Sequence, residues 1–272
     1  HALVRRQRQM CIRDRDLIKH SIIPLTGLEN SLAAVKALQN VSIQWKIKST
    51  PSIIWERWPN EKSRVLDEYQ SKKVLSRIGI NVPKGFVITD KNSLLNKFRT
   101  IKKAVCLKAI GINHKTDVSG VVLGIDTENE LLNKFNNMKR LTGSKEFLIE
   151  RQVDNCLVEL LIGIVRDPQH GFMITIAEGG VLSELRKDSV TLCMPCNKTE
   201  IARALEKLKI WPLLNGYRNK KAANISNIVL AIFSLQRYAL KERARLVELE
   251  INPLLVKSNQ VVAADALIRE NY

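Results

Sequence analysis

The chain has 272 residues, of which 45% are hydrophobic and 26% charged, a balance typical of a folded globular protein that excludes a disordered one. No apolar run is long enough to cross a membrane, so we expect no membrane partner. The formal net charge of +17 would suit a polyanionic partner, but the lysines and arginines are scattered without interleaved aromatic residues, which argues against nucleic acid.

The N-terminal segment is strongly basic and lacks apolar periodicity. Its run Arg5–Arg15, RRQRQMCIRDR, resembles the translated adapter read-through found at the ends of metagenomic gene models. We therefore predict that residues 1–15 are artefactual or disordered. No apolar segment follows these charges, as one would in a secretory signal.

The chain has five cysteines, an odd number at irregular spacing, which favours a reduced, cytoplasmic protein. The pair Cys193 and Cys196 lacks the second pair that a zinc site needs.

Residues 16–62 are predicted to be the end of a larger domain followed by a linker. The apolar run Ser21–Leu25 indicates a short strand, and apolar residues between Asn30 and Leu38 recur at helical spacing. One strand and one helix cannot bury their apolar faces alone, so we expect their partners to lie outside this sequence. Residues 41–62, with three tryptophans, two prolines and mixed charges, are predicted to be an inter-domain linker.

Residues 63–272 are predicted to form one α+β domain, and its first half alternates helices with strands. Local signals define three helix ends, because Asp90 and Thr127 are suitable N-caps and Gly143 is a suitable stop. The predicted elements are a helix at 65–78, a strand at 86–89, a helix at 90–101, strands at 104–107 and 121–125, and a helix at 127–143.

The second half is predicted to begin with an antiparallel sheet, because three strand-like runs follow one another with short breaks. These runs are Glu146–Val153, Leu157–Val165 and Phe172–Ala177. They are followed by helices at 199–209 and 225–243 and by a final pair of strands, Leu246–Lys257 and Gln260–Ile268.

The stretch between the strands at 104–107 and 121–125 has the composition of an anion-binding loop. Lys108 closes the first strand, and the loop offers cations, hydroxyls and backbone N–H groups that could hold a polyphosphate. The loop residues concerned are His114, Lys115, Thr116, Asp117, Ser119 and Gly120. An ordinary polar hairpin is the alternative, since lysines are common in loops.

Carboxylate and amide side chains occur at the ends of several predicted strands. Glu150 and Glu159 lie in the middle of the chain, and Glu250, Asn252 and Asp265 belong to the final strand pair. Such oxygens on neighbouring strands suit magnesium, with the phosphates of ATP completing the octahedron. Together with the basic loop, they could form a metal side and a cation side for one polyphosphate. The alternative is that each is a solvated charge at a strand end.

Five segments occur in the order seen in a known enzyme family. They are DEYQSKKVLSRIGINVPKG, CLKAIGINHKTDVSGVVLGI, FLIERQVDNCLVELLIGIVRDPQHG, LLNGYR, and ELEINPLLV followed by VVAADALI. Together they resemble the ATP-grasp portion of NDP-forming acyl-CoA synthetases, such as ADP-forming acetate–CoA ligase, and more distantly the succinyl-CoA synthetase β subunit. The resemblance implies an ATP-grasp fold of two α+β subdomains over residues 63–272. It also implies that residues 16–62 are a fragment of a flavodoxin-like α/β domain with its linker.

The resemblance assigns the phosphates, the nucleoside, the metal and the phosphoryl transfer to different residues. The phosphates would be bound by Lys108, Lys115 and Gly120. Glu150 and Val153 would contact the adenine, and Glu159 would contact the ribose. Asn252 and Asp265 would be the magnesium ligands, and His114, Lys115 and Glu250 would carry out phosphoryl transfer. In the family, acid, CoA and ATP give acyl-CoA, ADP and phosphate. CoA and the carboxylic acid would bind a domain or subunit outside this sequence.

Two departures from the family pattern keep alternatives open. Ser119 precedes Gly120 where the family has two glycines, and Thr191 and Leu192 occupy the region of an expected arginine. A degenerate or regulatory ATP-grasp domain, for example in a fused protein acetyltransferase, would bind nucleotide without turnover. A basic nucleic-acid-binding protein is the other alternative.

Overall fold

In the computed structural model, the described residues are 12–25, 27–46, 62–111, 120–180, 187–218 and 221–272. The chain divides into two compact units, residues 1–50 and residues 51–272. Among the described helices, none is both long enough and apolar enough to span a membrane.

The first unit is helical over most of its described part. Residues 12–19 are helical, and helix α2 extends over Leu28–Lys46, past the predicted start of the linker. The predicted strand at Ser21–Leu25 is wrong: residues 22–25 have no regular structure, because a strand needs a neighbouring strand to satisfy its backbone groups. The described part of this unit therefore shows no flavodoxin-like sheet, and apolar side chains of α2 are exposed, Leu38 to 69%.

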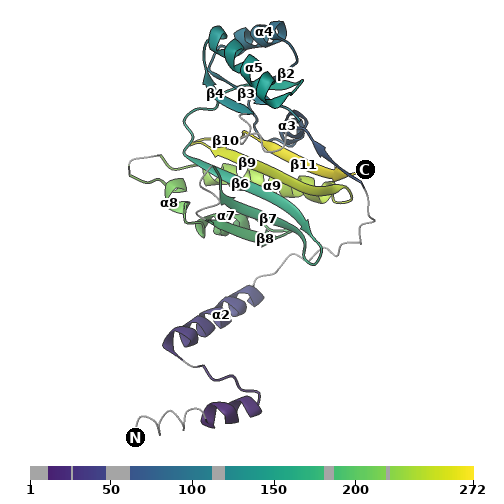
Figure 1. The fold of residues 1–272 in the computed structure, drawn as a ribbon. Coiled ribbons are helices and arrows are strands. Elements are labelled where there is room, and N and C mark those ends of the chain that lie inside the picture. Colours follow the sequence, from purple (N-terminus) through teal and green to yellow (C-terminus); the bar gives the residue numbers. More distant parts are fainter. Residues whose placement is uncertain (1–11, 26, 47–61, 112–119, 181–186, 219–220) are drawn as a thin grey trace. The chain divides into compact units, whose positions relative to one another are not determined.

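The second unit contains a 7-stranded antiparallel sheet (Figure 1). Its strands are β1 (Ser63–Leu66), β6 (Val158–Asp167), β7 (Gly171–Glu178), β8 (Ser189–Cys193), β9 (Leu246–Val256), β10 (Val261–Ala263) and β11 (Ala266–Asn271). Their order is β1-β11-β9-β6-β7-β8, and β10 also pairs with β9. The long strand β9 therefore places the C-terminal strands beside β6.

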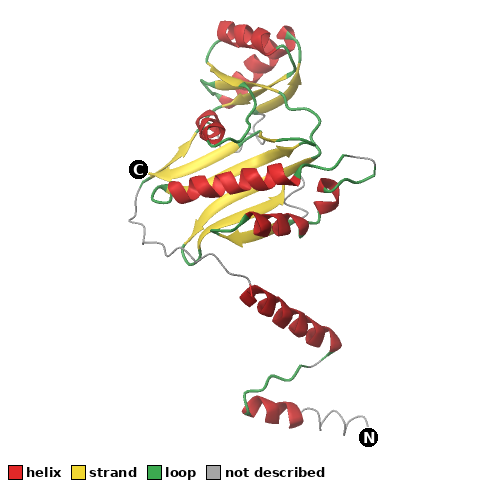
Figure 2. Ribbon diagram, turned by 180° about the vertical axis from the view of Figure 1, so that it is seen from behind, coloured by secondary structure: helices red, strands yellow, loops and turns green. Residues whose placement is uncertain are grey.

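Helices cover one face of this sheet (Figure 2). They are α7 (Lys198–Glu206), the short α8 (Trp211–Leu214) and α9 (Ile225–Lys241). Helix α9 is apolar on the side that faces the sheet, and its Ile228, Ile232 and Leu235 are fully buried in the core cluster. The two long helices agree with the predicted ones at 199–209 and 225–243.

A separate 4-stranded sheet has the order β2-β5-β3-β4. Its strands are β2 (Gly85–Ile88), β3 (Val105–Ala109), β4 (Val121–Ile125) and β5 (Phe147–Arg151), and its helices are α4 (Lys91–Ile101) and α5 (Glu128–Thr142). Both helices pack on the sheet and form the upper end of the second unit in Figure 1. The predicted caps are confirmed: Asp90 accepts from the N–H of Ser93, Thr127 accepts from the N–H of Glu130, and Gly143 ends α5 with φ of 65°.

Several elements differ from the prediction because strand pairing depends on distant partners. Val65 and Leu66, predicted to be helical, belong to strand β1, which pairs with β11, and helix α3 (Glu68–Arg77) begins only after its N-cap Asp67. The final predicted strand at 260–268 is divided into β10 and β11, and β8 was not predicted.

The three runs predicted to form one antiparallel sheet, now strands β5, β6 and β7, lie in two different sheets. Strand β5 pairs with β2 and β3, whereas β6 pairs with β7 and β9. The segment 152–157 between β5 and β6 therefore connects the two sheets, and this connection positions the site described next.

Candidate functional site

Four charged side chains, here termed the ionic quartet, are buried where α3 meets β3 and β5. They are Glu68 and Lys72 from α3, Lys108 from β3 and Glu150 from β5. Lys72 Nζ lies 2.7 Å from Glu68 Oε1 and 2.8 and 2.7 Å from the two carboxylate oxygens of Glu150. Lys108 Nζ lies 2.6 Å from Glu68 Oε1 and 3.3 Å from Glu150 Oε2. Two positive and two negative charges therefore balance one another away from water.

The quartet keeps Lys108 charged. Burial opposes its positive charge, but the carboxylates of Glu68 and Glu150 outweigh burial and hold the pKa of Lys108 well above its ordinary value. The neighbouring Cys106 has Sγ 3.9 Å from Glu150 Oε2, and burial raises the pKa of this thiol to about 11. Lys108 is thus a fixed cation at neutral pH, and Cys106 is a neutral thiol.

Lys108 also reaches the C-terminal strands. Its Nζ donates to the carbonyl oxygen of Ala264 at 2.7 Å, which joins β3 to the segment between β10 and β11. The next residue, Asp265, adds a further negative charge near this ammonium group. The N–H of Asn252 donates to the carbonyl oxygen of Asp265 at 3.3 Å. The predicted phosphate-binding lysine and the two predicted metal ligands therefore lie in one neighbourhood.

Asn252 and Asp265 have donor atoms that fit magnesium. Asn252 is exposed and Asp265 half-buried, and Asp265 Oδ1 accepts from the N–H of Ala266 at 2.7 Å, which orients the carboxylate. Magnesium commonly binds one or two protein side chains and completes its shell with phosphate and water. In the described ranges, no group of three His, Cys, Asp or Glu residues could hold a metal. Glu250 is half-buried on the same strand as Asn252.

Glu159 lies beside a close approach of two backbone segments at the end of β7. The N–H of Gly179 donates to the carbonyl oxygen of Glu159 at 2.8 Å. A Cβ atom at Gly180 would lie 2.8 Å from Glu159 Oε2, and Gly180 has φ of +86°. Glycine at this position therefore leaves room for the exposed Glu159 carboxylate and permits the left-handed backbone.

We expect Gly179→Ala to lower the free energy of unfolding by about 1–3 kcal/mol, because the added Cβ atom would lie 2.9 Å from the carbonyl carbon of Leu160, and this backbone must shift to make room. Gly163→Ala is the matched control, since Gly163 lies on the neighbouring strand β6 and its added Cβ atom would meet nothing closer than Leu161 Cδ2 at 3.8 Å. Urea unfolding should give the larger loss for Gly179→Ala. Equal losses would show that the two backbone segments do not constrain each other at this point.

The predicted anion-binding loop is only partly described. His114 and Lys115 lie outside the described residues. Gly120, the first described residue after them, is buried, and its carbonyl oxygen accepts from the N–H of Ala109 at 2.8 Å. The loop therefore ends in a backbone pair with the strand that contains Lys108.

The Glu150 carboxylate is held by Lys72, and Val153 in the following segment is half-buried. The adenine contact predicted for Glu150 and Val153 stays a prediction. Glu68 and Lys72 were not predicted to be site residues. Their opposite charges four residues apart on one helix were the available signal, but such pairs usually stabilise an exposed helix surface.

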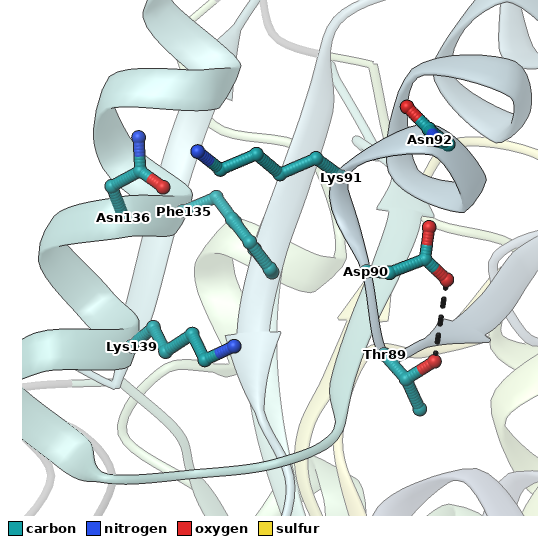
Figure 3. Close-up of a pocket in the computed structure, with 7 residues that line it drawn as sticks. All are labelled: Thr89, Asp90, Lys91, Asn92, Phe135, Asn136 and Lys139. Atoms are coloured by element: carbon teal, nitrogen blue, oxygen red, sulfur yellow. Dashed lines mark hydrogen bonds between the residues drawn. The ribbon is translucent and has the colours of Figure 1, made fainter.

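One hollow of about 590 Å³ lies elsewhere, between the start of α4 and the side of α5 (Figure 3). It is lined by Thr89, Asp90, Lys91, Asn92, Phe135, Asn136 and Lys139. Asp90 is engaged as the N-cap of α4, and none of the predicted site residues lines the hollow. We therefore place the candidate site at the quartet and the C-terminal strands.

Comparison with known proteins supports the predicted fold. A family model described as "ATP-grasp domain" matches residues 57–269. The chain is 26% identical over 215 residues to the β subunit of ADP-forming acetate–CoA ligase I of Pyrococcus furiosus, covering 75% of this chain and 91% of that subunit. It is 28% identical over 206 residues to ADP-forming acetate–CoA ligase II of Archaeoglobus fulgidus, of which it spans only 30%.

Solved structures are also similar to this chain. Acetyl-coenzyme A synthetase 1 of Ca. Korarchaeum cryptofilum, solved with coenzyme A and Ca-AMPCP, superimposes with a TM-score of 0.69 at 26% identity, covering 75% of this chain and 92% of that one. A form with Mg-AMPPCP, whose phosphohistidine segment points towards the nucleotide binding site, has a TM-score of 0.64 at 26% identity, covering 74% and 90%. The predicted α+β fold of two subdomains is confirmed, and the chain belongs to the ATP-grasp family.

Proposed function

We propose that this chain is the Mg·ATP-binding module of an ADP-forming acid–CoA ligase. The observation that supports this most is the 2.7 Å contact between Lys108 Nζ and the carbonyl oxygen of Ala264, across 156 residues of sequence. It brings a buried, permanently charged lysine beside Asp265, the candidate metal carboxylate. A cation next to a hard-ligand pair is the arrangement that a metal-bound polyphosphate requires.

In this proposal ATP lies between the two sheets. The adenine lies against the segment 152–157, which includes Val153, and Glu159 accepts hydrogen bonds from the ribose. The phosphates meet Lys108 and the loop that contains Lys115 and ends at Gly120. From adenine to phosphates, the nucleotide would extend from the connection between the sheets to the quartet.

Asn252 and Asp265 would hold magnesium, which when bound would offset the negative charge of the phosphates. The chain's own residues then align the terminal phosphoryl group with His114. A nitrogen of His114 forms a bond to the terminal phosphorus while the bond to the bridging oxygen of ADP breaks, so the products are phosphohistidine and ADP. Lys115 stabilises the transferring group, and Glu250 orients Asn252, the metal ligand on the same strand.

The complete reaction needs parts that lie outside this sequence, since the chain spans 30% of the Archaeoglobus fulgidus relative. We propose that CoA and a carboxylic acid bind a CoA-binding or ligase domain, fused or on a separate subunit. There the acid would take the phosphoryl group from phosphohistidine to form an acyl phosphate, and the CoA thiol would displace inorganic phosphate from it to give acyl-CoA in the cytoplasm.

One observation favours a second candidate, a nucleotide sensor without turnover. Thr191, in the region where the family has an arginine, lies on β8 with its hydroxyl 3.2 Å from that of Thr175. It supplies no cation for the leaving ADP, so binding without phosphoryl transfer is the corresponding outcome.

Calorimetric titration tests the proposed binding. The chain should bind ATP saturably with magnesium and much more weakly in EDTA. Asp265→Ala should weaken Mg·ATP binding by roughly tenfold or more, because even the residues behind metal ligands contribute about 10–100-fold. Asp126→Ala, which removes an exposed carboxylate at the end of β4, is the control and should leave affinity unchanged. Unchanged affinity in Asp265→Ala would remove this residue from the site.

A further inference from the structure

We propose that Glu68 is a positioning residue that fixes the Lys108 ammonium group where it meets the phosphates of ATP. The inference rests on the proposed function. It assigns a role to a helix residue that is not itself expected to contact nucleotide, because Glu68 is only 4% exposed.

Among the described residues, three acceptor oxygens lie near Lys108 Nζ, at different distances. Glu68 Oε1 lies at 2.6 Å, the carbonyl oxygen of Ala264 at 2.7 Å and Glu150 Oε2 at 3.3 Å. A lysine side chain has many rotamers, and an ammonium group held by one charged acceptor and one carbonyl retains few of them. Glu68 is therefore the stronger of the two carboxylate contacts that orient this cation.

Glu68 is itself held in place. It is the first residue of α3, whose N-cap Asp67 accepts from the N–H of Gln70 at 2.7 Å. The same Oε1 atom that binds Lys108 also accepts from Lys72, one helical turn later. A carboxylate bound to two cations from different elements cannot rotate without breaking one of the ion pairs.

Glu150 has a different part in the quartet. Its two oxygens lie 2.8 and 2.7 Å from Lys72 and its closer approach to Lys108 is 3.3 Å. Glu150 thus fixes Lys72, Lys72 fixes Glu68, and Glu68 fixes Lys108 against Ala264. The result is a set spacing between the phosphate-binding cation and Asp265.

The test compares two ligands, Mg·ATP by calorimetry and adenosine by ligand-observed NMR titration. Glu68→Gln should weaken Mg·ATP binding roughly ten- to hundredfold, the range for a hydrogen bond between charged groups, and should leave adenosine affinity unchanged. Glu270→Gln is the matched control. Glu270 is also buried and binds Arg64 at 2.6 Å, but it lies on β11, outside the quartet. Its substitution should therefore leave the affinities for Mg·ATP and for adenosine unchanged.

Glu68→Asp covers the case in which Glu68→Gln does not fold. It retains the charge balance and withdraws the carboxylate by one methylene group, so Mg·ATP affinity should fall severalfold while adenosine affinity remains. In a Lys108→Gln background, Glu68→Gln should cause little additional loss of Mg·ATP affinity, because Glu68 acts through Lys108.

Three results would overturn the inference. Equal weakening of Mg·ATP and adenosine would show general damage to the fold. No change in Mg·ATP affinity, or additive losses with Lys108→Gln, would show that Glu68 does not act through the lysine. In each case wild-type binding of Mg·ATP would leave the proposed function intact, whereas absence of wild-type binding would overturn the proposed function and the inference together.

Discussion

Lys72→Ala is expected to lower the free energy of unfolding by about 3–5 kcal/mol, the usual cost of removing one partner from a buried ion pair. The Lys72 side chain is 3% exposed and is bound by both Glu68 and Glu150. Without it, two buried carboxylates share Lys108 as their remaining quartet cation. The loss would be a large fraction of the roughly 5–15 kcal/mol that stabilises an ordinary domain.

Lys73→Ala is the matched control for this prediction. Lys73 is the next residue of α3, is exposed, and places its Nζ 4.3 Å from the centre of the Tyr69 ring. Loss of that contact should cost at most about 1 kcal/mol. Urea unfolding followed by circular dichroism measures both variants, and similar small losses would mean that the quartet is not a stabilising cluster.

His114→Ala is expected to abolish phosphoryl transfer while nucleotide binding survives. Wild-type protein incubated with magnesium and ATP labelled in the terminal phosphate should acquire acid-labile, base-stable label, the signature of phosphohistidine. Removal of the His114 imidazole removes the nucleophile, whereas Lys108, Glu159 and Asp265 remain to bind Mg·ATP. Calorimetry on the same variant checks that binding persists.

His170→Ala is the matched control for the labelling experiment. His170 lies in the turn between β6 and β7, is exposed, and has Nδ1 2.8 Å from Asp167 Oδ1. Its substitution should leave the label intact. Label that persists in His114→Ala and disappears in His170→Ala would transfer the role to His170. Absence of label from the wild-type chain, with ATP bound, would favour the sensor.

Local signals in the sequence predicted much of the smaller sheet and its helices. Asp90 and Thr127 are N-caps and Gly143 is a helix stop because their side chains or backbone satisfy groups within a few residues. Such local interactions can be predicted from residues that are close together in the sequence. The strands on either side of the predicted anion-binding loop were also predicted, since they are short, apolar and β-branched.

Long-range pairing limited the rest of the fold prediction. Strand β5 was predicted to pair with β6, which follows it in the sequence, but it pairs with β2 and β3. The run Ser21–Leu25 resembled a strand, yet residues 22–25 have no regular structure, because a strand exists only when a partner accepts its hydrogen bonds. Neither the pairing of β5 nor the lack of a strand at residues 22–25 can be read from the segment's own residues.

Residues predicted to bind a ligand could be named from the sequence, whereas the residues that hold them in place could not. Lys108, Asn252 and Asp265 were named from strand-end chemistry, and the structure brings them together. Glu68 contacts Lys108 across 40 residues, and Lys72 contacts Glu150 across 78. Helix periodicity gives no indication that two charged residues of α3 are buried, since burial depends on those distant partners.

In the proposed binding mode, ATP lies between the two sheets, with adenine at the segment that joins them. Photolabelling with an azido-adenine analogue of Mg·ATP, followed by trypsin digestion and mass spectrometry, would locate the adenine. We predict label in the peptide 152–166, which contains Val153 and Glu159, and loss of that label when unmodified Mg·ATP competes. Competed label in peptides that contain Thr89 or Asn136, which line the hollow between α4 and α5, would contradict the account.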